Sequence, residues 1–324
     1  MMLEKLRSEL PWAEKYRPAV MSDIISNQYI IKSLKQFIKL NTLPHLLFYG
    51  PSGCGKTSTI KCCVKKIYGK HARAMILELN ASNDRGIEIV RTLILGFISS
   101  GTVCSYPHEN PNSFKMVILD EFDSMTADAQ GMLRRIIEQN SNRVRFCLIC
   151  NDIEKVTPAI KSRCAIYQFM PLKAKDMKDR LIEISNKEKI TIDDDAINGI
   201  INVSNSDMRT AINTLHYVYQ INKTIDADTV YRATGNLTPS MSKKLFKMMQ
   251  GGNLSSTVKE VYAIICETNI TMSNFLECLR QQIVMNNHPK KLYIIIKLAE
   301  LEIGDALTVH PFITIAGIVS LFKA

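Results

Sequence analysis

The chain has 324 residues, 46% of them hydrophobic, and a formal net charge of +10 at pH 7. This length allows two or three domains with a substantial core, and charged residues interrupt every apolar run before it reaches the length of a membrane span. The first ten residues mix charges and lack the apolar stretch of a signal peptide, so we expect a soluble intracellular protein.

The charge and the cysteines narrow the class of protein further. A basic surface suits a polyanionic partner, although a lysine-rich surface without such a partner has the same net charge. Nine cysteines at irregular spacing favour free thiols over a disulfide framework. Cys147 and Cys150 have the spacing of half a zinc site. They lie in an apolar run that predicts a buried strand, where residues three apart face opposite sides, so free thiols are again favoured.

The first distinctive element is a short apolar strand over His45–Tyr49, followed by a glycine-rich segment and a helix from about Thr57. The segment fits the pattern G-x-x-x-x-G-K-[ST] of a phosphate-binding loop. Glycines let backbone N–H groups wrap around an anion, and the positive end of the helix dipole adds to the attraction. A chance glycine-rich turn is the alternative. The predicted nucleotide-binding residues of this loop are Gly50, Pro51, Ser52, Gly53, Cys54, Gly55, Lys56, Thr57 and Ser58.

An acidic pair follows two strands later. The apolar run Met116–Leu119 predicts a strand that ends in Asp120 and Glu121. Lys56 would contact the β- and γ-phosphates of ATP, and Asp120 with the Thr57 hydroxyl would hold Mg²⁺. Glu121 would polarise the water that attacks the γ-phosphate. Acidic residues often end strands, so this interpretation depends on the phosphate-binding loop that precedes them.

Two more polar side chains sit at strand ends. Asn151 follows a strand predicted over Arg145–Cys150, and its amide would contact the γ-phosphate or the attacking water, unless it only starts a turn. Arg163 precedes the last strand, Ala165–Phe169, and its planar cationic fork suits phosphate oxygens. Its own nucleotide should lie at the other end of the strands. We therefore predict that Arg163 reaches the ATP of a neighbouring subunit; an ordinary surface ion pair is the alternative.

These strands, with another predicted over Met75–Leu79, alternate with helical runs as far as Met170. The alternation predicts an α/β fold, with a parallel sheet flanked by helices on both faces. Ligands of such sheets bind beyond the carboxyl ends of the strands, where the motifs above fall. We expect this nucleotide-binding domain to cover residues 1–170.

A small domain of three helices is expected over 171–235, because apolar residues there follow helical spacing in three stripes. Arg209 lies at the start of the third helix. The helix dipole does not favour a cation at that end, so we expect Arg209 to point back at the nucleotide rather than into solvent. The expected caps of the second and third helices are Asp193 or Asp194 and Ser206 or Asp207.

The linker Gly235–Pro239 leads into the remainder of the chain, 236–324, which we expect to form a third domain. Its helical pattern is broken at Gly251-Gly252, near 286–289 and at His310-Pro311, which predicts about five helices.

The motifs in this order resemble those of AAA+ ATPases. Three further segments resemble the small subunits of the replication factor C clamp loader: Pro11–Pro18, Glu78–Ile87 and Ile160–Cys164. The resemblance covers about the first 220 residues, and the region 240–324 matches only in length and helical character. It implies an AAA+ P-loop sheet domain, a helical lid domain and a C-terminal helical collar domain through which subunits assemble.

The resemblance implies an ATPase that uses ATP and Mg²⁺ within a DNA sliding-clamp loader. Such a loader opens a ring clamp of the proliferating-cell nuclear antigen type and places it on primer–template DNA during replication. The implied partners are that clamp, the DNA and other loader subunits in a ring of five, with no membrane. The implied location is the nucleus in a eukaryote, or the cytoplasm or viral factory in an archaeal or viral setting.

The resemblance also assigns individual residues. It places Lys56, Thr57, Asp120, Glu121, Asn151 and Arg209 in the subunit's own ATP site, Tyr16, Arg17 and Pro18 near the adenine, and Arg163 in trans. Asn80 matches a residue that restrains the catalytic glutamate until DNA binds. Arg85 and Gly86 match positions facing the DNA backbone, where a basic side chain and a helix N-terminus suit a phosphate. Gln130 and Arg134 match a helix that couples neighbouring sites.

Some residues depart from the family pattern, and two other functions stay open. The departures are Ser26, Asn83, Phe122 and Ser206, of which Phe122 is expected to add bulk beside Glu121. One alternative is another DNA-directed AAA+ machine, such as a branch-migration motor or an initiator. The region 240–324 lacks the pattern of an initiator's winged-helix module. The other alternative is a non-hydrolysing ATP-binding scaffold of the same assembly, which both acidic residues count against.

Overall fold

The computed structural model describes residues 10–82, 87–100, 114–268, 270–286, 290–305 and 311–323. The chain divides into two compact units: Met1–Arg180 with Ser206–Asn213, and Leu181–Asn205 with Thr214–Ala324. The domain boundaries predicted after residues 170 and 235 stay predictions. Within the described ranges, no helix combines the length and the apolar character that crossing a membrane requires.

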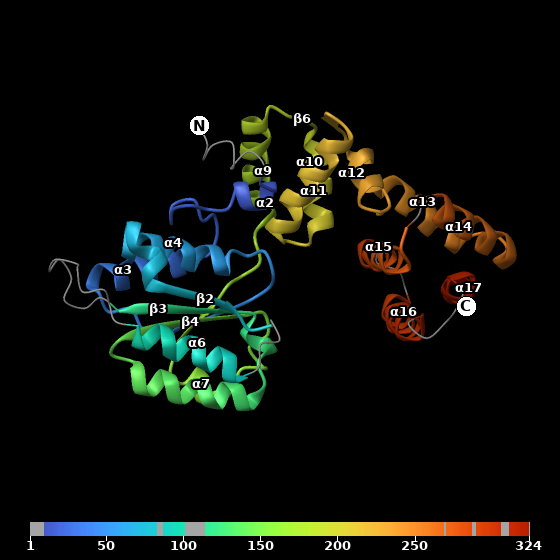
Figure 1. The fold of residues 1–324 in the computed structure, drawn as a ribbon. Coiled ribbons are helices and arrows are strands. Elements are labelled where there is room, and N and C mark those ends of the chain that lie inside the picture. Colours follow the sequence, from blue (N-terminus) through green and yellow to red (C-terminus); the bar gives the residue numbers. More distant parts are fainter. Residues whose placement is uncertain are drawn as a thin grey trace. The chain divides into compact units, whose positions relative to one another are not determined.

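The first unit is built on a five-stranded parallel sheet with the strand order β2-β3-β4-β1-β5 (Figure 1). Each apolar run predicted as a strand forms one, with ends shifted by at most one residue. Strands β3, β4 and β1 lie inside the sheet and are nearly continuous in buried apolar residues, as expected for strands covered on both faces. The strands are β1 (Leu46–Tyr49), β2 (Ile76–Asn80), β3 (Lys115–Asp120), β4 (Val144–Cys150) and β5 (Ala165–Gln168).

Helices cover both faces of this sheet, which confirms the predicted fold class (Figure 1). Helices α3 (Gln28–Leu40) and α4 (Lys56–Tyr68) pack on one face, against Phe48 and its neighbours. Helices α6 (Ile87–Ser99) and α7 (Ala127–Asn140) pack on the other face, against Leu47 and its neighbours. Cys147 belongs to the first cluster and Cys150 to the second. The two thiols therefore point to opposite faces, as predicted.

Short helical segments connect these layers. They are α2 (Trp12–Lys15), η1 (Gly69–His71), α5 (Ala72–Met75), η2 (Phe122–Ser124) and α8 (Pro158–Lys161). Helix α7 begins at a capped turn, because the Thr126 hydroxyl accepts a hydrogen bond from the backbone N–H of Ala129.

The segment after the sheet holds the three predicted helices, α9 (Ala174–Glu188), α10 (Asp194–Ser204) and α11 (Met208–Ile221). Asp193 is the N-cap residue of α10, and Asp207 caps α11 by accepting hydrogen bonds from the N–H groups of Arg209 and Thr210. The structure adds a fourth helix, α12 (Ala227–Ala233), and a two-stranded parallel ribbon of β6 (Thr191–Ile192) and β7 (Thr224–Ile225). Elements this short do not span enough residues to set up a hydrophobic period.

Five helices follow in the described part of the C-terminal region, which matches the number predicted. They share one apolar core that includes Phe275, Ile283 and Ile318. The predicted breaks fall between them, and Pro239 occupies the first turn of α13, where its missing N–H is harmless. These helices are α13 (Pro239–Gln250), α14 (Leu254–Thr268), α15 (Met272–Met285), α16 (Lys291–Asp305) and α17 (Pro311–Lys323).

One residue in the turn before α11 is strained. Ser206 has a φ of +66° and Asn205 a φ of +48°. A Cβ in this left-handed region costs about 1–2 kcal/mol, and asparagine tolerates the region better than serine. Glycine relieves the strain but loses about 0.5–1 kcal/mol through the greater freedom of its unfolded chain.

We therefore expect Ser206→Gly to raise the free energy of unfolding by about 0.5–1 kcal/mol. Asn205→Gly is the matched control, with a smaller or no gain. The midpoint of urea unfolding, followed by circular dichroism, measures both changes. A lower midpoint for Ser206→Gly than for the unchanged chain would show that the turn is not strained at this residue.

Candidate functional site

A cavity of about 280 Å³ opens in the first unit, at the carboxyl ends of the strands and the start of α4. It brings together predicted site residues from five separate segments of the chain. They are Tyr16, Arg17 and Pro18; Ser52, Gly53, Cys54, Gly55, Lys56, Thr57 and Ser58; Asp120 and Glu121; Asn151; and Arg209. Ile24 and Ile25 line the same cavity. A cavity with apolar walls and a glycine-rich polar loop can hold a base and its phosphates together.

The loop between β1 and α4 has a backbone that only glycine adopts without strain. Gly50, Gly53 and Gly55 have φ values of +143°, +64° and +94°. A Cβ on Gly53 would lie 1.8 Å from the Asp207 carboxylate, and one on Gly50 would lie 2.2 Å from the Phe169 carbonyl oxygen. The spacing of glycines that predicted the loop therefore follows from both conformation and close packing.

Lys56 is 7% exposed, and its ammonium group is held inside the loop. Its Nζ donates hydrogen bonds to the carbonyl oxygens of Gly50 and Pro51, each at 2.7 Å, and to Oδ1 of Asn151 at 2.9 Å. An ammonium has three N–H donors, so all of them are engaged. A phosphate that enters the loop would take over one or more of these hydrogen bonds.

Thr57 and Asp120 provide oxygens that fit a magnesium ion. The Thr57 hydroxyl donates to Oδ2 of Asp120 at 2.9 Å, which joins the first turn of α4 to the tip of β3. Hydroxyl and carboxylate oxygens are hard donors of the kind that Mg²⁺ takes, beside the phosphates of a nucleotide. The two predicted metal ligands thus lie together at the mouth of the phosphate-binding loop.

Glu121 lines the cavity with an exposed side chain and has a φ of +53°. A left-handed glutamate costs free energy and persists only where its surroundings impose it, which is common in active sites. Phe122 is fully buried in the core beside α7 and does not line the cavity. The expected bulk of Phe122 beside Glu121 is therefore absent, because the sharp turn at Glu121 sends the aromatic ring into the core.

Arg209 lies at the cavity with 62% of its side chain exposed. Its guanidinium lies 3.9 Å from the Glu14 carboxylate, which also pairs with Arg17 at 2.8 Å. Arg180 is a further cation at the cavity and donates to the Tyr16 carbonyl oxygen at 2.9 Å. Sequence reasoning missed Glu14 and Arg180, since neither belongs to a recognisable phosphate-binding pattern.

Two aspartates accept hydrogen bonds from segments that line the site, and the sequence does not predict this role. Oδ2 of Asp207 accepts a 2.7 Å hydrogen bond from the Ser52 hydroxyl, so the helix cap of α11 also contacts the phosphate-binding loop. Asp123 accepts from the backbone N–H groups of Asn151 and Asp152, each at 3.1 Å. An aspartate before a helical stripe predicts a cap, but no local pattern predicts a contact with a loop far along the chain.

Cys54 is the one thiol in the phosphate-binding loop. Burial raises the pKa of the Cys54 thiol, against the opposing effect of the nearby Lys56 ammonium. Its Sγ donates to the Pro51 carbonyl oxygen at 2.9 Å. The protonated thiol therefore helps to shape the loop and adds no charge that would repel a phosphate.

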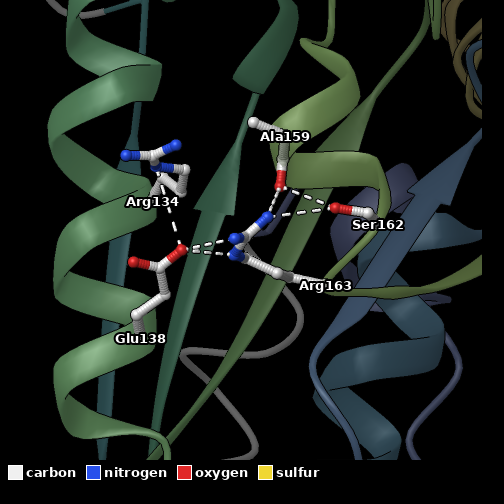
Figure 2. Close-up of polar contacts among 5 residues, drawn as sticks. All are labelled: Arg134, Glu138, Ala159, Ser162 and Arg163. Carbon is white, nitrogen blue, oxygen red and sulfur yellow. Dashed lines mark hydrogen bonds and ion pairs between the residues drawn. The ribbon is translucent and has the colours of Figure 1, made fainter.

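The remaining predicted residues lie elsewhere. Oδ1 of Asn80 accepts hydrogen bonds from the backbone and hydroxyl of Ser82, and Asn80 is not bonded to Glu121 in this structure. Arg163 does not line the cavity and forms an ion pair with Glu138 of its own chain (Figure 2). Arg85 and Gly86 lie outside the described residues. The roles predicted for these four residues stay predictions.

Two family models match consecutive parts of the chain. The model for the ATPase family associated with various cellular activities (AAA) matches residues 46–172, and that for the RFC1-like AAA+ ATPase lid domain matches residues 174–232. The first match contains the phosphate-binding loop and the acidic pair, and the second contains Arg209.

Curated relatives are similar over most of the chain. A protein of Acanthamoeba polyphaga mimivirus described as a replication factor C small subunit is 49% identical, over 94% of this chain and 91% of its own length. Replication factor C subunit 3 of Schizosaccharomyces pombe is 39% identical, over 91% of this chain and 85% of its own. Replication factor C subunit 5 of Homo sapiens is 36% identical, over 98% and 93%.

Among solved structures, the RuvB Holliday junction branch migration motor of Thermotoga maritima resembles this chain with a TM-score of 0.53. The likeness covers 82% of this chain and 91% of the RuvB chain, at 17% sequence identity. At that identity the likeness concerns the fold alone.

Proposed function

This chain belongs to the replication factor C small-subunit family of AAA+ ATPases, and on that premise we propose that it is an ATP-hydrolysing subunit of a sliding-clamp loader. The observation that carries the proposal is the meeting of Lys56, Thr57, Asp120, Glu121 and Asn151 around one cavity at the carboxyl ends of the strands. These residues supply a cation, two hard oxygens, a carboxylate and an amide, which is the set that phosphoryl transfer to water needs.

Each of these groups has a role in the proposed reaction. Lys56 exchanges its loop contacts for the β- and γ-phosphates of ATP, and Asn151 turns its freed amide oxygen toward the attacking water. Glu121 accepts a proton from that water as it attacks the γ-phosphate. Thr57 and Asp120 would hold Mg²⁺, which neutralises charge on the phosphates. Arg209 contacts the same nucleotide from the start of α11.

Assembly with other subunits completes the proposal. The relatives' names describe subunits of a larger factor, and we propose that this chain occupies one place in a ring of five that opens a clamp on primer–template DNA. Arg163 supplies its guanidinium to the ATP of the neighbouring subunit. The net charge of +10 supports a polyanionic partner such as DNA. Arg85 and Gly86 are the proposed contacts with the DNA backbone, and Asn80 is the proposed restraint on Glu121.

Glu121→Gln is the direct test of hydrolysis by this subunit. The variant keeps the size of the side chain but cannot accept a proton, so we expect ATP binding to persist while turnover at this site falls about 10²–10⁴-fold. The part of the complete complex's phosphate release that is lost when only this subunit is changed measures turnover at this site, and a fluorescent nucleotide measures binding. Glu154→Gln, at an exposed glutamate that does not line the cavity, is the control.

Unchanged turnover in the Glu121→Gln complex would favour the alternative of a non-hydrolysing scaffold. A branch-migration motor shares the fold, but likeness at 17% identity does not carry function. A strand-displacement assay on a four-way junction distinguishes a clamp loader from a branch-migration motor. We expect no branch migration by the complex, and ATP-dependent migration would point to the motor.

A further inference from the structure

Arg163 makes four polar contacts within its own chain (Figure 2). Its Nε and Nη2 lie 2.6 and 2.5 Å from the same oxygen, Oε1 of Glu138 on α7. Its Nη1 donates to the Ala159 carbonyl oxygen at 2.6 Å and to the Ser162 hydroxyl oxygen at 3.0 Å. The side chain is nevertheless 34% exposed, so the guanidinium lies at the surface, within reach of another molecule.

The contacts leave little of the guanidinium for a phosphate. A guanidinium has five N–H donors: three of them donate hydrogen bonds here, and the ion pair with Glu138 also occupies Nη2. A bidentate contact with a phosphate needs two parallel N–H groups on adjacent nitrogens, and neither edge of the group has both free. The negative charge of Glu138 also offsets the positive charge that would attract a phosphate. Arg163 must therefore leave at least part of this arrangement before it can grip a nucleotide.

A second arginine, Arg134, lies close enough to pair with the Glu138 carboxylate. Arg134 lies one helical turn before Glu138 on α7, with its Nε 3.9 Å from the same Oε1. That distance allows electrostatic attraction but is too long for a hydrogen bond. The Nε of Arg134 is buried and has no hydrogen-bond partner, which is a costly state for a donor. Figure 2 shows Arg134 above the shared carboxylate and Arg163 to its right, with contacts from both to the same oxygen.

We propose that Glu138 is a positioning residue that holds Arg163 within its own subunit. When Arg163 turns to a neighbour's nucleotide, the Glu138 carboxylate pairs with Arg134 instead. The proposal rests on the proposed role of Arg163 in trans. The exchange keeps the carboxylate paired in both states and supplies the missing partner of the Arg134 Nε. Release of Arg163 therefore leaves no unpaired charge, and the arginine engages only where a correctly placed triphosphate competes with Glu138.

The first test is Glu138→Gln in the complete complex, without DNA or clamp. Glutamine keeps the size of the side chain and one acceptor oxygen but removes the charge, so Arg163 is held less tightly. We expect hydrolysis at the neighbouring site to rise about three- to fivefold, the scale of an exposed ion pair, and phosphate release by the complex to rise with it. Glu183→Gln is the matched control, because Glu183 is similarly exposed and pairs with Lys187 at 2.6 Å. It should leave the rate unchanged.

Combined variants separate this inference from the proposed function. If Arg163→Ala does not lower turnover, the role in trans fails, and the inference fails with it. If Arg163→Ala lowers turnover but Glu138→Gln leaves it unchanged or reduces it, only the inference is overturned.

The inference is supported only if the rise in turnover with Glu138→Gln disappears in the Arg163→Ala background. Arg134→Gln should lower turnover alone and have no effect beside Glu138→Gln; an equal loss in both backgrounds would overturn the exchange.

A measurement on the isolated chain does not depend on assembly. The Nε–H of Arg163, assigned by its loss in Arg163→Lys, should exchange with water at least about threefold faster in Glu138→Gln than in the unchanged chain, by nuclear magnetic resonance. An unchanged exchange rate would show that Glu138 does not hold the guanidinium and would overturn the proposal.

Discussion

Lys56→Ala is expected to weaken ATP binding by the isolated chain at least about hundredfold. The ammonium of Lys56 is buried at the centre of the phosphate-binding loop and is the cation placed to meet the β- and γ-phosphates. A hydrogen bond to a charged group contributes about 1.5–3 kcal/mol, and each 1.4 kcal/mol changes affinity about tenfold. Isothermal titration with ATP and Mg²⁺ measures the loss. Lys61→Ala is the matched control, because Lys61 lies on the same helix, is 36% exposed and pairs with Glu78.

Thermal unfolding with and without ATP is a second test of the Lys56→Ala variant. A ligand that binds only the folded chain stabilises it by an amount set by the ratio of its concentration to Kd. ATP should therefore raise the Tm of the unchanged chain and of Lys61→Ala but not that of Lys56→Ala. Comparison of Tm values without nucleotide checks that each variant is folded. Equal ATP affinity for Lys56→Ala and the unchanged chain would mean that the loop does not bind the triphosphate.

Arg163→Ala is expected to separate binding from catalysis between subunits. Arg163 does not line its own chain's cavity, so the isolated variant should bind ATP with a Kd within about twofold of the unchanged chain. In the complete complex, hydrolysis at the neighbouring site should fall about 10³–10⁵-fold, the contribution of an arginine supplied in trans. Arg73→Ala, at an exposed arginine on α5, controls for loss of a surface cation.

Two results with Arg163→Ala would contradict the role in trans. If the isolated variant loses ATP affinity, Arg163 serves its own nucleotide and the assignment in trans is wrong. If affinity and turnover are both unchanged, the ion pair with Glu138 is an ordinary surface contact, which is the alternative that the sequence left open.

The elements that the sequence predicted well are those that local pattern determines. The strands of the sheet are apolar runs that end in polar residues. Parallel topology brings the carboxyl ends of such strands to one edge of the sheet. That rule is enough to place Asp120, Glu121 and Asn151 beside the loop that contains Lys56. The sequence predicts either Ser206 or Asp207 as the cap of α11, and the hydrogen bonds show that Asp207 is the cap.

The contacts that the sequence did not predict join segments far apart along the chain. Asp207 reaches Ser52, Arg180 reaches Tyr16, and Arg163 reaches Glu138. Each depends on side-chain direction and on the spacing between packed elements, which no local period encodes. The small ribbon of β6 and β7 was missed for another reason, because two-residue strands carry no alternation that a pattern can detect.

The most direct test of the account is the structure of the complete complex, determined by electron cryomicroscopy with a non-hydrolysable ATP analogue and Mg²⁺. We expect the analogue in the cavity of this subunit, with its phosphates beside Lys56 and Thr57, and Arg163 turned to the γ-phosphate of the analogue in the adjoining subunit. An empty cavity, or an Arg163 still paired with Glu138 while the adjoining site is filled, would contradict the claim that this chain binds a triphosphate and helps its neighbour to cleave one.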